Sequence, residues 1–373
     1  MRLCNLLADT KLKTERLLAD VAGDVERAAS LLASGATVAF PTETVYGLGA
    51  NALDRTAVAK IFVAKQRPRW DPLIVHVDGP EMLTQVALLP IGTEGCVVAK
   101  LIEAFWPGPL TLLLPRTVTV PDAVTAGRPL VGVRMPAHPV ALELIGRARL
   151  PIAAPSANRF GHTSPTAAAH VLADLDGRIN AVLDGGPTRV GVESTVLDVG
   201  ARAIYRPGAV TAAMIAEAIG QEVRVVSAAG VLENKADSSA TLRNDKQGLQ
   251  KDKQEQRNNN GAGLASPGMG MRHYAPRARL LLVAGQSAML LEVAKHAAAE
   301  VGVMLPDGWN AGGAEEVFRW GTWEDAETLA RRLFAGLRKL DERGVKAIVC
   351  PLPKMSGLGD ALRDRLEKAA RAK

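Results

Sequence analysis

Cysteine is scarce in this chain. The 373 residues contain three cysteines, Cys4, Cys96 and Cys350, which are odd in number and far apart. This spacing argues against a disulfide framework and offers no cysteine zinc motif, since both need paired or closely spaced cysteines. We therefore predict a protein of a reducing compartment, with a cytoplasmic location.

Long apolar runs are absent as well. No stretch of about 18 apolar residues occurs, so we expect no membrane-spanning helix and no membrane partner. Residues 1–20 carry acids at Asp9, Glu15 and Asp20 and lack the continuous apolar core of a signal peptide.

Aromatic residues make up only 4% of the chain, and the net charge is a modest +6. The basic bias suits a phosphate-bearing or nucleic-acid partner, but many enzymes with neither are equally basic. The shortage of aromatics argues against RNA recognition by stacking. A nucleic-acid-binding module therefore stays open as an alternative, and it predicts RNA affinity that falls as salt rises.

The chain is too long for one small core, and we expect two domains. In the first part, helix and strand patterns follow each other without strict alternation, which predicts an α/β fold with a twisted, mixed sheet. The predicted helices span residues 25–34, 54–65, 97–105 and 165–175. The predicted strands span residues 36–40, 73–77, 110–115, 131–134, 152–154, 181–184, 194–199 and 203–205.

A polar segment separates the two domains. Residues 228–263 have almost no large apolar side chain, so they cannot bury enough surface to offset the entropy of ordering. We predict a catalytic domain over residues 1–217, a partly disordered linker over 218–277 and a smaller domain over 278–373.

Strand and helix patterns alternate in the last domain, which predicts a small Rossmann-like α/β unit. No G-x-G-x-x-G sequence follows its first strand, so dinucleotide binding is not indicated. The predicted strands span residues 280–283, 301–305 and 347–350, and the helices 287–300, 324–343 and 358–370.

Two motifs concentrate polar groups within about ten residues each. They are FPTETVYGLG at residues 40–49 and SPGMGMRHYAP at residues 266–276. Buried segments rarely contain so many hydrogen-bonding groups unless a ligand or a tight bend satisfies them. We predict that both motifs line one site.

Other candidate ligand-binding groups lie at the ends of predicted elements. Lys65 and Arg67 follow a helix, where favourable interaction with the helix dipole is the simpler explanation. His76 and Arg134 close two apolar strands, and an arginine there suits a carboxylate or phosphate. There is no G-x-x-x-x-G-K-[ST] loop and no H-x-x-H pair for zinc. The residues alone indicate an α/β enzyme with a phosphate or carboxylate ligand.

The motifs together resemble the long, two-domain form of the threonylcarbamoyl-AMP synthase family, the YrdC-like proteins. The resemblance covers nearly the whole chain. It rests on PTETVYGLGAN (41–51), KQRP (65–68), PLIVH (72–76), WPGPLT (106–111), GVRMP (132–136), APSAN (154–158), ESTV (193–196), RPG (206–208), SPGM (266–269), RHYAP (272–276), GLGDA (357–361) and DRL (364–366).

This resemblance implies a nucleotidyltransferase that joins L-threonine, bicarbonate and ATP into threonylcarbamoyl-AMP and releases pyrophosphate. Mg²⁺ would arrive with ATP, no organic cofactor is expected, and no metal would be held by the protein alone. The product would pass to the tRNA threonylcarbamoyl-transferase machinery, which modifies the adenosine next to the anticodon. Weak RNA binding by the enzyme itself stays open.

The resemblance also assigns residues. Those implied to hold threonine are Thr44, His76, Arg134, Ala154 and Ser194. Those implied to hold ATP are Arg67, Asp71, Ser156, Ser164 and Arg206, with His273 or Tyr274 closing over the nucleotide. Lys65 and Arg67 would neutralise phosphate charge as the catalytic pair. The family commonly has Asn at the position of Asp71, where an acid needs a cation between itself and the phosphates, and Thr at that of Leu130.

Two further alternatives compete with this interpretation. A carbamoyl-transfer relative of the kind used in hydrogenase maturation would need acylphosphatase-like and zinc-finger regions, which this sequence lacks. Two purely structural α/β domains would leave both polar motifs unexplained.

Overall fold

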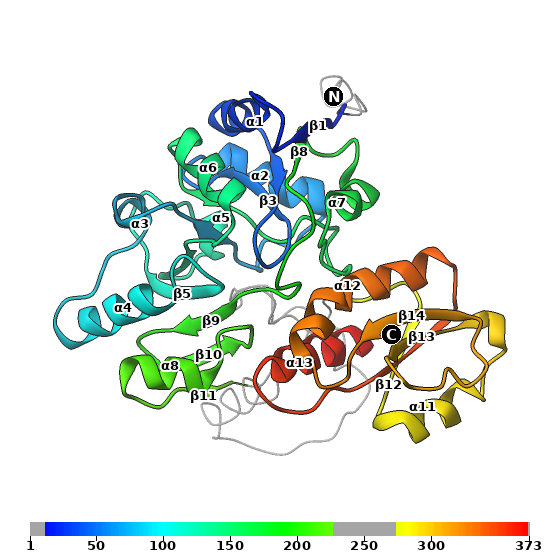
Figure 1. Cartoon of the computed structure of the whole chain (residues 1–373). Coiled ribbons are helices and arrows are strands. Elements are labelled where there is room, and N and C mark those ends of the chain that lie inside the picture. The colour runs from blue at the N-terminus through cyan, green and yellow to red at the C-terminus, as the bar shows by residue number, and fades with distance from the viewer. Residues whose placement is uncertain (1–11, 227–273, 372–373) are drawn as a thin grey trace, which may run out of the picture.

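Figure 1 presents the structure, a computed structural model that describes residues 12–226 and 274–371. The polar segment 228–263 and His273 lie outside the described residues. Helix α8 (Ala212–Ile219) crosses the boundary predicted at residue 217, and β11 (Arg224–Val225) pairs with the first sheet. The domain limits themselves stay a prediction.

The larger sheet has 11 strands within the described ranges, in the order β1-β8-β2-β3-β7-β4-β6-β5-β9-β10-β11. They are β1 (Glu15–Leu18), β2 (Val38–Phe40), β3 (Gly47–Asn51), β4 (Ile74–His76), β5 (Leu110–Pro115), β6 (Leu130–Arg134), β7 (Ile152–Ala153), β8 (Ala181–Asp184), β9 (Thr195–Asp198), β10 (Ala203–Arg206) and β11. Strand β6 runs parallel to β4 and antiparallel to β5, so the predicted mixed sheet is confirmed.

The central strands are short apolar runs because they are buried on both faces, where alternation with polar residues is not needed. Every residue of β4 is buried, as are residues 110–114 of β5. Polar residues therefore appear where strands end. His76 and Arg134 are opposite each other in the register of β4 and β6, which places two predicted site residues side by side.

Helices surround the larger sheet (Figure 1). They are α1 (Asp24–Ala33), α2 (Arg55–Lys65), α3 (Pro80–Val86), α4 (Gly92–Phe105), α5 (Asp122–Thr125), α6 (Pro139–Ala148), α7 (Ala168–Leu175) and α8. Helix α2 begins as predicted after Asp54, whose Oδ1 accepts from the Thr56 amide at 2.7 Å. The helix predicted from residue 165 begins instead at Ala168, because the Pro165 carbonyl accepts from the Tyr46 amide of the first motif at 2.9 Å.

The smaller sheet is parallel throughout, with the order β12-β15-β13-β14, and confirms the predicted Rossmann-like unit. Its elements are β12 (Arg279–Val283), α11 (Gly285–Val293), the 3₁₀ turn η1 (Ala298–Glu300), β13 (Val301–Pro306), β14 (Glu316–Gly321), α12 (Ala326–Glu342), β15 (Ala347–Pro351) and α13 (Leu358–Ala370). The prediction of one helix over 287–300 was wrong, since α11 ends at Val293. Strand β14 was missed.

The two sheets meet through a shared apolar cluster. Val45 and Val192 of the first domain are buried with Phe334 of α12 and with Tyr274. Gly191 faces α12 so closely that a Cβ atom there would lie 2.4 Å from Arg331 Cα. The C-terminal domain therefore packs directly against the segments that carry the candidate site. None of the helices in the described ranges is long and apolar enough to cross a membrane.

Candidate active site

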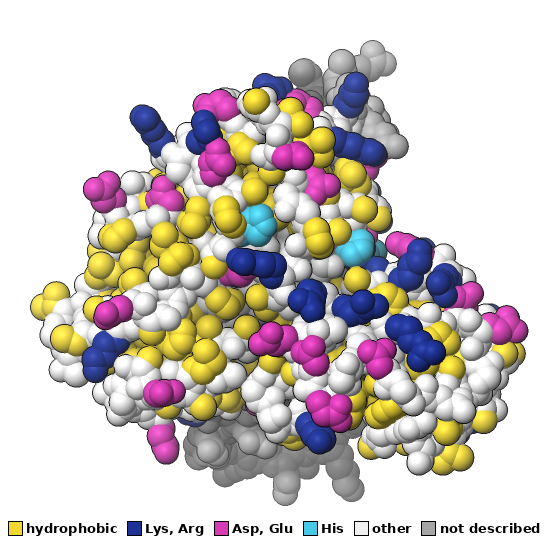
Figure 2. Space-filling view, in the orientation of Figure 1, with side chains coloured by type: hydrophobic (Ala, Val, Ile, Leu, Met, Phe, Trp, Pro, Cys, Tyr) yellow, Lys and Arg dark blue, Asp and Glu magenta, His cyan; other side chains and the backbone are white. Residues whose placement is uncertain are grey.

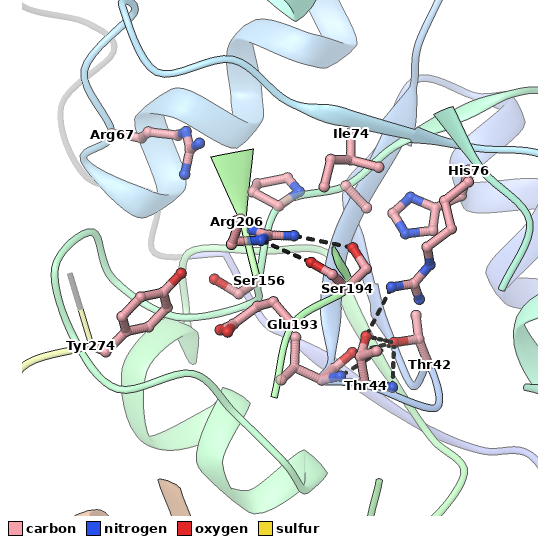
Figure 3. A pocket seen from close by; sticks show the side chains of 15 residues that line it. Thr42, Thr44, Arg67, Ile74, His76, Ser156, Glu193, Ser194, Arg206 and Tyr274 are labelled. Carbon is pink, nitrogen blue, oxygen red and sulfur yellow. Dashed lines mark hydrogen bonds between the residues drawn. The ribbon is translucent and has the colours of Figure 1, made fainter. Parts of the chain in front are cut away.

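A pocket opens where the polar ends of β4, β6 and β9 meet the connection between β2 and β3 (Figure 3). It is lined by Thr42, Thr44, Val45, Gly47, Arg67, Ile74, His76, Arg134, Ala154, Pro155, Ser156, Glu193, Ser194, Arg206 and Tyr274. Nine of the residues predicted from the resemblance are among these: Thr44, Arg67, His76, Arg134, Ala154, Ser156, Ser194, Arg206 and Tyr274. Thr44 of the first motif and Tyr274 of the second thus line one pocket.

The first motif is a buried, internally hydrogen-bonded turn. Thr42 Oγ1 donates to the Val45 carbonyl at 2.7 Å and lies 2.8 Å from Thr44 Oγ1. Arg134 Nη1 donates to Thr44 Oγ1 at 3.0 Å, and Arg134 Nη2 forms an ion pair with Glu43 at 3.1 Å. A tight bend therefore satisfies much of this polar motif and aims Thr44 and Arg134 into the pocket.

His76 lies against Arg134 at the same edge of the sheet. Burial, followed by the neighbouring Arg134 charge, lowers the pKa of His76 from its ordinary value to about 3. The imidazole is neutral at physiological pH as a result. Its Nδ1 is buried and has no hydrogen-bond partner within the described residues.

Ser194 and Arg206 form the floor of the pocket, with the bonds visible in Figure 3. Arg206 donates to the Ser194 carbonyl at 3.0 Å and to its Oγ at 3.1 Å. Thr111 Oγ1 lies 2.8 Å from the same hydroxyl. Gly208 lets the RPG segment pack closely against residues 194 and 195, because a Cβ at Gly208 would lie 2.4 Å from the Thr195 amide nitrogen. The RPG motif thus fixes one arginine of the site.

Lys65 does not line the pocket. It is fully buried at the end of α2 and donates to the carbonyls of Ser156, at 2.5 Å, and of Asn158. Burial and then the charge of Arg67 hold its pKa well below the usual range. Its terminal amino group therefore holds the turn that carries Ser156. The interaction with the helix dipole expected from the sequence is not its main contact.

Arg67 does line the pocket, with Asp71 behind it. Arg67 Nη2 lies 2.9 Å from Asp71 Oδ2 and also donates to the Pro72 carbonyl at 2.8 Å. Asp71 is fully buried and does not reach the pocket wall. A cation thus stands between this acid and the pocket.

Ser164 also lies behind the wall, and it leads to residues whose roles the sequence did not suggest. Its hydroxyl donates to Glu193 Oε1 at 2.5 Å, while Glu193 Oε2 accepts from Arg365 Nε at 2.8 Å. Burial favours the neutral acid, but Arg365 and Arg206 outweigh it and hold the pKa of Glu193 below its ordinary value. Glu193 and Arg365 belong to the ESTV and DRL motifs, which are the sequence signals that could have pointed to them.

Tyr274 covers one side of the pocket. Its ring stacks on Phe334 with centroids 5.7 Å apart, and burial followed by Glu193 raises the pKa of its phenol. Figure 3 shows Tyr274 and Arg67 on the side away from His76. The pocket therefore has a hydroxyl-rich half around Thr44 and a second half bounded by Arg67 and Tyr274.

A metal ion has no ready-made ligand set in the described part of the chain, where no group of three His, Cys, Asp or Glu side chains could hold one. The carboxylate of Glu193 is engaged by Arg365 and that of Asp71 by Arg67.

Both halves of the chain match known protein families. The family described as telomere recombination matches residues 30–208, and the threonylcarbamoyl-AMP synthase C-terminal domain matches residues 210–371. A threonylcarbamoyl-AMP synthase of Pyrococcus abyssi is 42% identical over 352 residues, covering 92% of this chain and 93% of the relative. The chain belongs to the threonylcarbamoyl-AMP synthase family.

Other members of the family agree over similar lengths. The Bacillus subtilis threonylcarbamoyl-AMP synthase is 40% identical and covers 96% of this chain and 98% of the relative. The solved structure of P. abyssi Sua5 complexed with L-threonine superposes with a TM-score of 0.78 at 38% identity, covering 96% of this chain and 98% of that one. The family resemblance predicted from the motifs is confirmed.

Proposed function

We propose that this protein forms threonylcarbamoyl-AMP and pyrophosphate from L-threonine, bicarbonate and ATP, as a nucleotidyltransferase. The observation that carries the proposal is a single pocket in which Arg67, Arg134 and Arg206 converge with hydroxyl groups and a neutral histidine. Three buried guanidinium groups suit a carboxylate together with a polyphosphate. The threonine-bound relative supports the amino-acid half of this assignment.

L-threonine would occupy the half of the pocket around Thr44, His76 and Arg134. Arg134 would take the α-carboxylate with the donors that its bonds to Thr44 and Glu43 leave over, because its guanidinium lines the pocket. The uncharged His76 ring can hydrogen-bond without repelling the substrate's ammonium group. Ala154 leaves room for close approach of the ligand, and Ser194 offers a hydroxyl at the floor.

ATP would occupy the half bounded by Arg67, Arg206 and Tyr274. Arg67 and Arg206 would balance phosphate charge, and the phenol ring offers a flat surface to the nucleotide. Ser156 would donate to the phosphates from the turn that Lys65 supports. Ser164 and Asp71 would act one layer further out, through Glu193 and Arg67.

The reaction needs no covalent enzyme intermediate. The threonine amine and bicarbonate condense to a carbamate with loss of water, and a carbamate oxygen then attacks the α-phosphorus of ATP. The new O–P bond forms as the bond to the β-phosphate oxygen breaks, and pyrophosphate leaves. The protein would contribute by holding the anions in line and by balancing their charge with Arg67 and Arg206.

Mg²⁺ would be carried by the ATP phosphates, where it offsets negative charge, since the described residues supply no ligand set of their own. The product is a labile mixed anhydride, so we also propose that it is consumed promptly by the tRNA-modifying machinery in the cytoplasm. On the face drawn in Figure 2, several basic side chains cross the middle of the molecule, with acidic side chains close above and below them.

The decisive experiment is pyrophosphate release by the full chain, measured with ATP and Mg²⁺ and with each common amino acid, with and without bicarbonate. Release that requires both L-threonine and bicarbonate is the expected result. Release with no such dependence, or none from folded protein, would refute the synthase activity. Salt-sensitive RNA binding in its absence would favour the alternative.

A further inference from the structure

Arg365 is a C-terminal-domain residue whose guanidinium lies fully buried next to the pocket without lining it. From α13 it reaches across the interface to Glu193, with Nε 2.8 Å from Oε2 and Nη2 3.4 Å from the Glu193 carbonyl. A buried arginine is costly unless it is well paired. Its partner here is a residue of the pocket wall.

The same guanidinium supports a second wall residue. Its Cζ atom lies 5.3 Å from the centre of the Tyr274 ring, within the range of a cation–π contact. The Tyr274 ring also stacks on Phe334 of α12, a second residue of the C-terminal domain. One side chain thus holds Glu193 and Tyr274, which come from segments about 80 residues apart in the chain.

Arg365 also has charged neighbours on its own helix. Its Nη1 donates to Asp364 Oδ2 at 2.6 Å, and Asp364 also pairs with Lys368 at 2.8 Å. Asp364 is thereby balanced within α13, which leaves the charge of Arg365 to balance Glu193. Without Arg365, Arg206 would still offset part of the Glu193 charge, but the buried carboxylate would lose its ion pair and would weaken the attraction of the pocket for anions.

We propose that Arg365 is a positioning residue through which the C-terminal domain makes the pocket able to bind ATP. It neutralises Glu193, so that this acid does not repel the phosphates, and it holds the Tyr274 ring against the pocket. The inference rests on the proposed function. It assigns to the second domain a direct part in nucleotide binding, in addition to its packing against the first.

The test uses the full-length Arg365→Met variant and titration calorimetry with ATP and, separately, with L-threonine. We expect the Kd for ATP to rise about 10- to 100-fold, and that for threonine to change by less than about threefold, because threonine carries no net charge. The double variant Arg365→Met/Glu193→Gln should bind ATP within about threefold of wild type, since the unpaired carboxylate is gone. An ATP affinity that stays low in the double variant would overturn the proposal, because the loss would then not come from the unpaired carboxylate.

Arg338→Met is the matched control. Arg338 is another nearly buried arginine of this interface, but it contacts Asp174 at 2.8 Å and the Thr163 carbonyl rather than Glu193. It should lower the unfolding temperature and leave the Kd for ATP within about threefold of wild type. Equal losses in both variants would mean that Arg365 only docks the domains, and would overturn the proposal.

Arg365→Lys keeps the charge but not the planar fork, and it serves if the methionine variant does not fold. We expect an ATP affinity about three- to tenfold below wild type, again restored by Glu193→Gln. ATP binding equal to wild type in either folded Arg365 variant would also overturn the inference. Failure of the wild-type chain to bind ATP would instead refute the proposed function, so the two failures are distinguishable.

Discussion

Replacing Asp71 by Asn should make the protein less stable and its ATP affinity higher. Asp71 is fully buried, and its carboxylate lies 2.9 Å from Nη2 of Arg67, which lines the pocket. The substitution keeps the shape of the side chain and removes one negative charge. Folding then loses an ion pair, while the Arg67 guanidinium is left with more of its charge for a phosphate.

The magnitudes follow from this geometry. At 2.9 Å, two unit charges in an effective dielectric of about 20 attract by roughly 6 kcal/mol. Desolvation of both groups offsets most of that, and Arg67 keeps its bonds to the Asp71 and Pro72 carbonyls, so the free energy of unfolding should fall by about 1–3 kcal/mol. Removing the negative charge behind Arg67 should strengthen ATP binding by about 1 kcal/mol, or about fivefold in Kd.

Urea unfolding and titration calorimetry with ATP measure the two effects. Asp122→Asn is the matched control, because Asp122 pairs with Arg116 at 2.6 Å but its side chain is 72% exposed. That variant should lose less than about 1 kcal/mol and bind ATP normally. A Kd for ATP raised tenfold in Asp71→Asn would refute the reasoning, and would mean that Asp71 itself contacts the nucleotide through a cation.

Three further predictions concern the pocket. His76→Gln should remove a pH dependence of the free energy of unfolding, measured by urea unfolding. The folded-state pKa of His76, about 3, lies below its unfolded value, so the wild-type protein is most stable above about pH 6.5. As the pH falls from there towards 3, the wild type should lose up to about 1.4 kcal/mol per pH unit through this residue. A difference from wild type that is constant with pH would contradict this. Gly208→Ala should lower the free energy of unfolding by about 2–4 kcal/mol, because the new Cβ would clash with the Thr195 amide. In the control Gly79→Ala the Cβ meets nothing within 4 Å, and the loss should be less than about 1 kcal/mol. Equal shifts of the unfolding temperature in the two variants would show that no clash occurs. Thr44→Val should weaken threonine binding about tenfold in calorimetry and leave ATP binding unchanged, and normal threonine affinity would exclude a direct contact.

Periodicity in the sequence predicted the elements whose burial is uniform. The leucines at 329, 333, 337 and 340 lie within the observed α12 and are buried as expected. Strand β14 was missed because its first four residues are half-buried or exposed, which gives neither a continuous apolar run nor a clean alternation. Helix α6 was overlooked although Pro139 at its first turn is a recognisable start signal.

For the candidate site, too, some features could be predicted from the sequence and others could not. Residues at strand ends, such as His76 and Arg134, could be placed at one edge because neighbouring strands bring their ends together. The sequence could not separate pocket walls from supporting layers. Lys65 and Asp71 lie two positions before and four positions after Arg67 in the chain, yet neither lines the pocket. The ammonium group of Lys65 is held by the Ser156 carbonyl, and the carboxylate of Asp71 by the Arg67 guanidinium.

The sequence by itself determined the family, the mixed sheet followed by a Rossmann-like unit, and a polar site built from several short motifs. The fold class follows from local patterns of apolar and polar residues. The family and the site follow from short motifs whose combination of residues and spacing is rarely needed for folding alone. Tertiary structure alone decided which charges meet. The pair Glu193 and Arg365 joins residues 172 positions apart across a domain interface, and the free energy of a buried ion pair depends on distances and burial that no local pattern encodes.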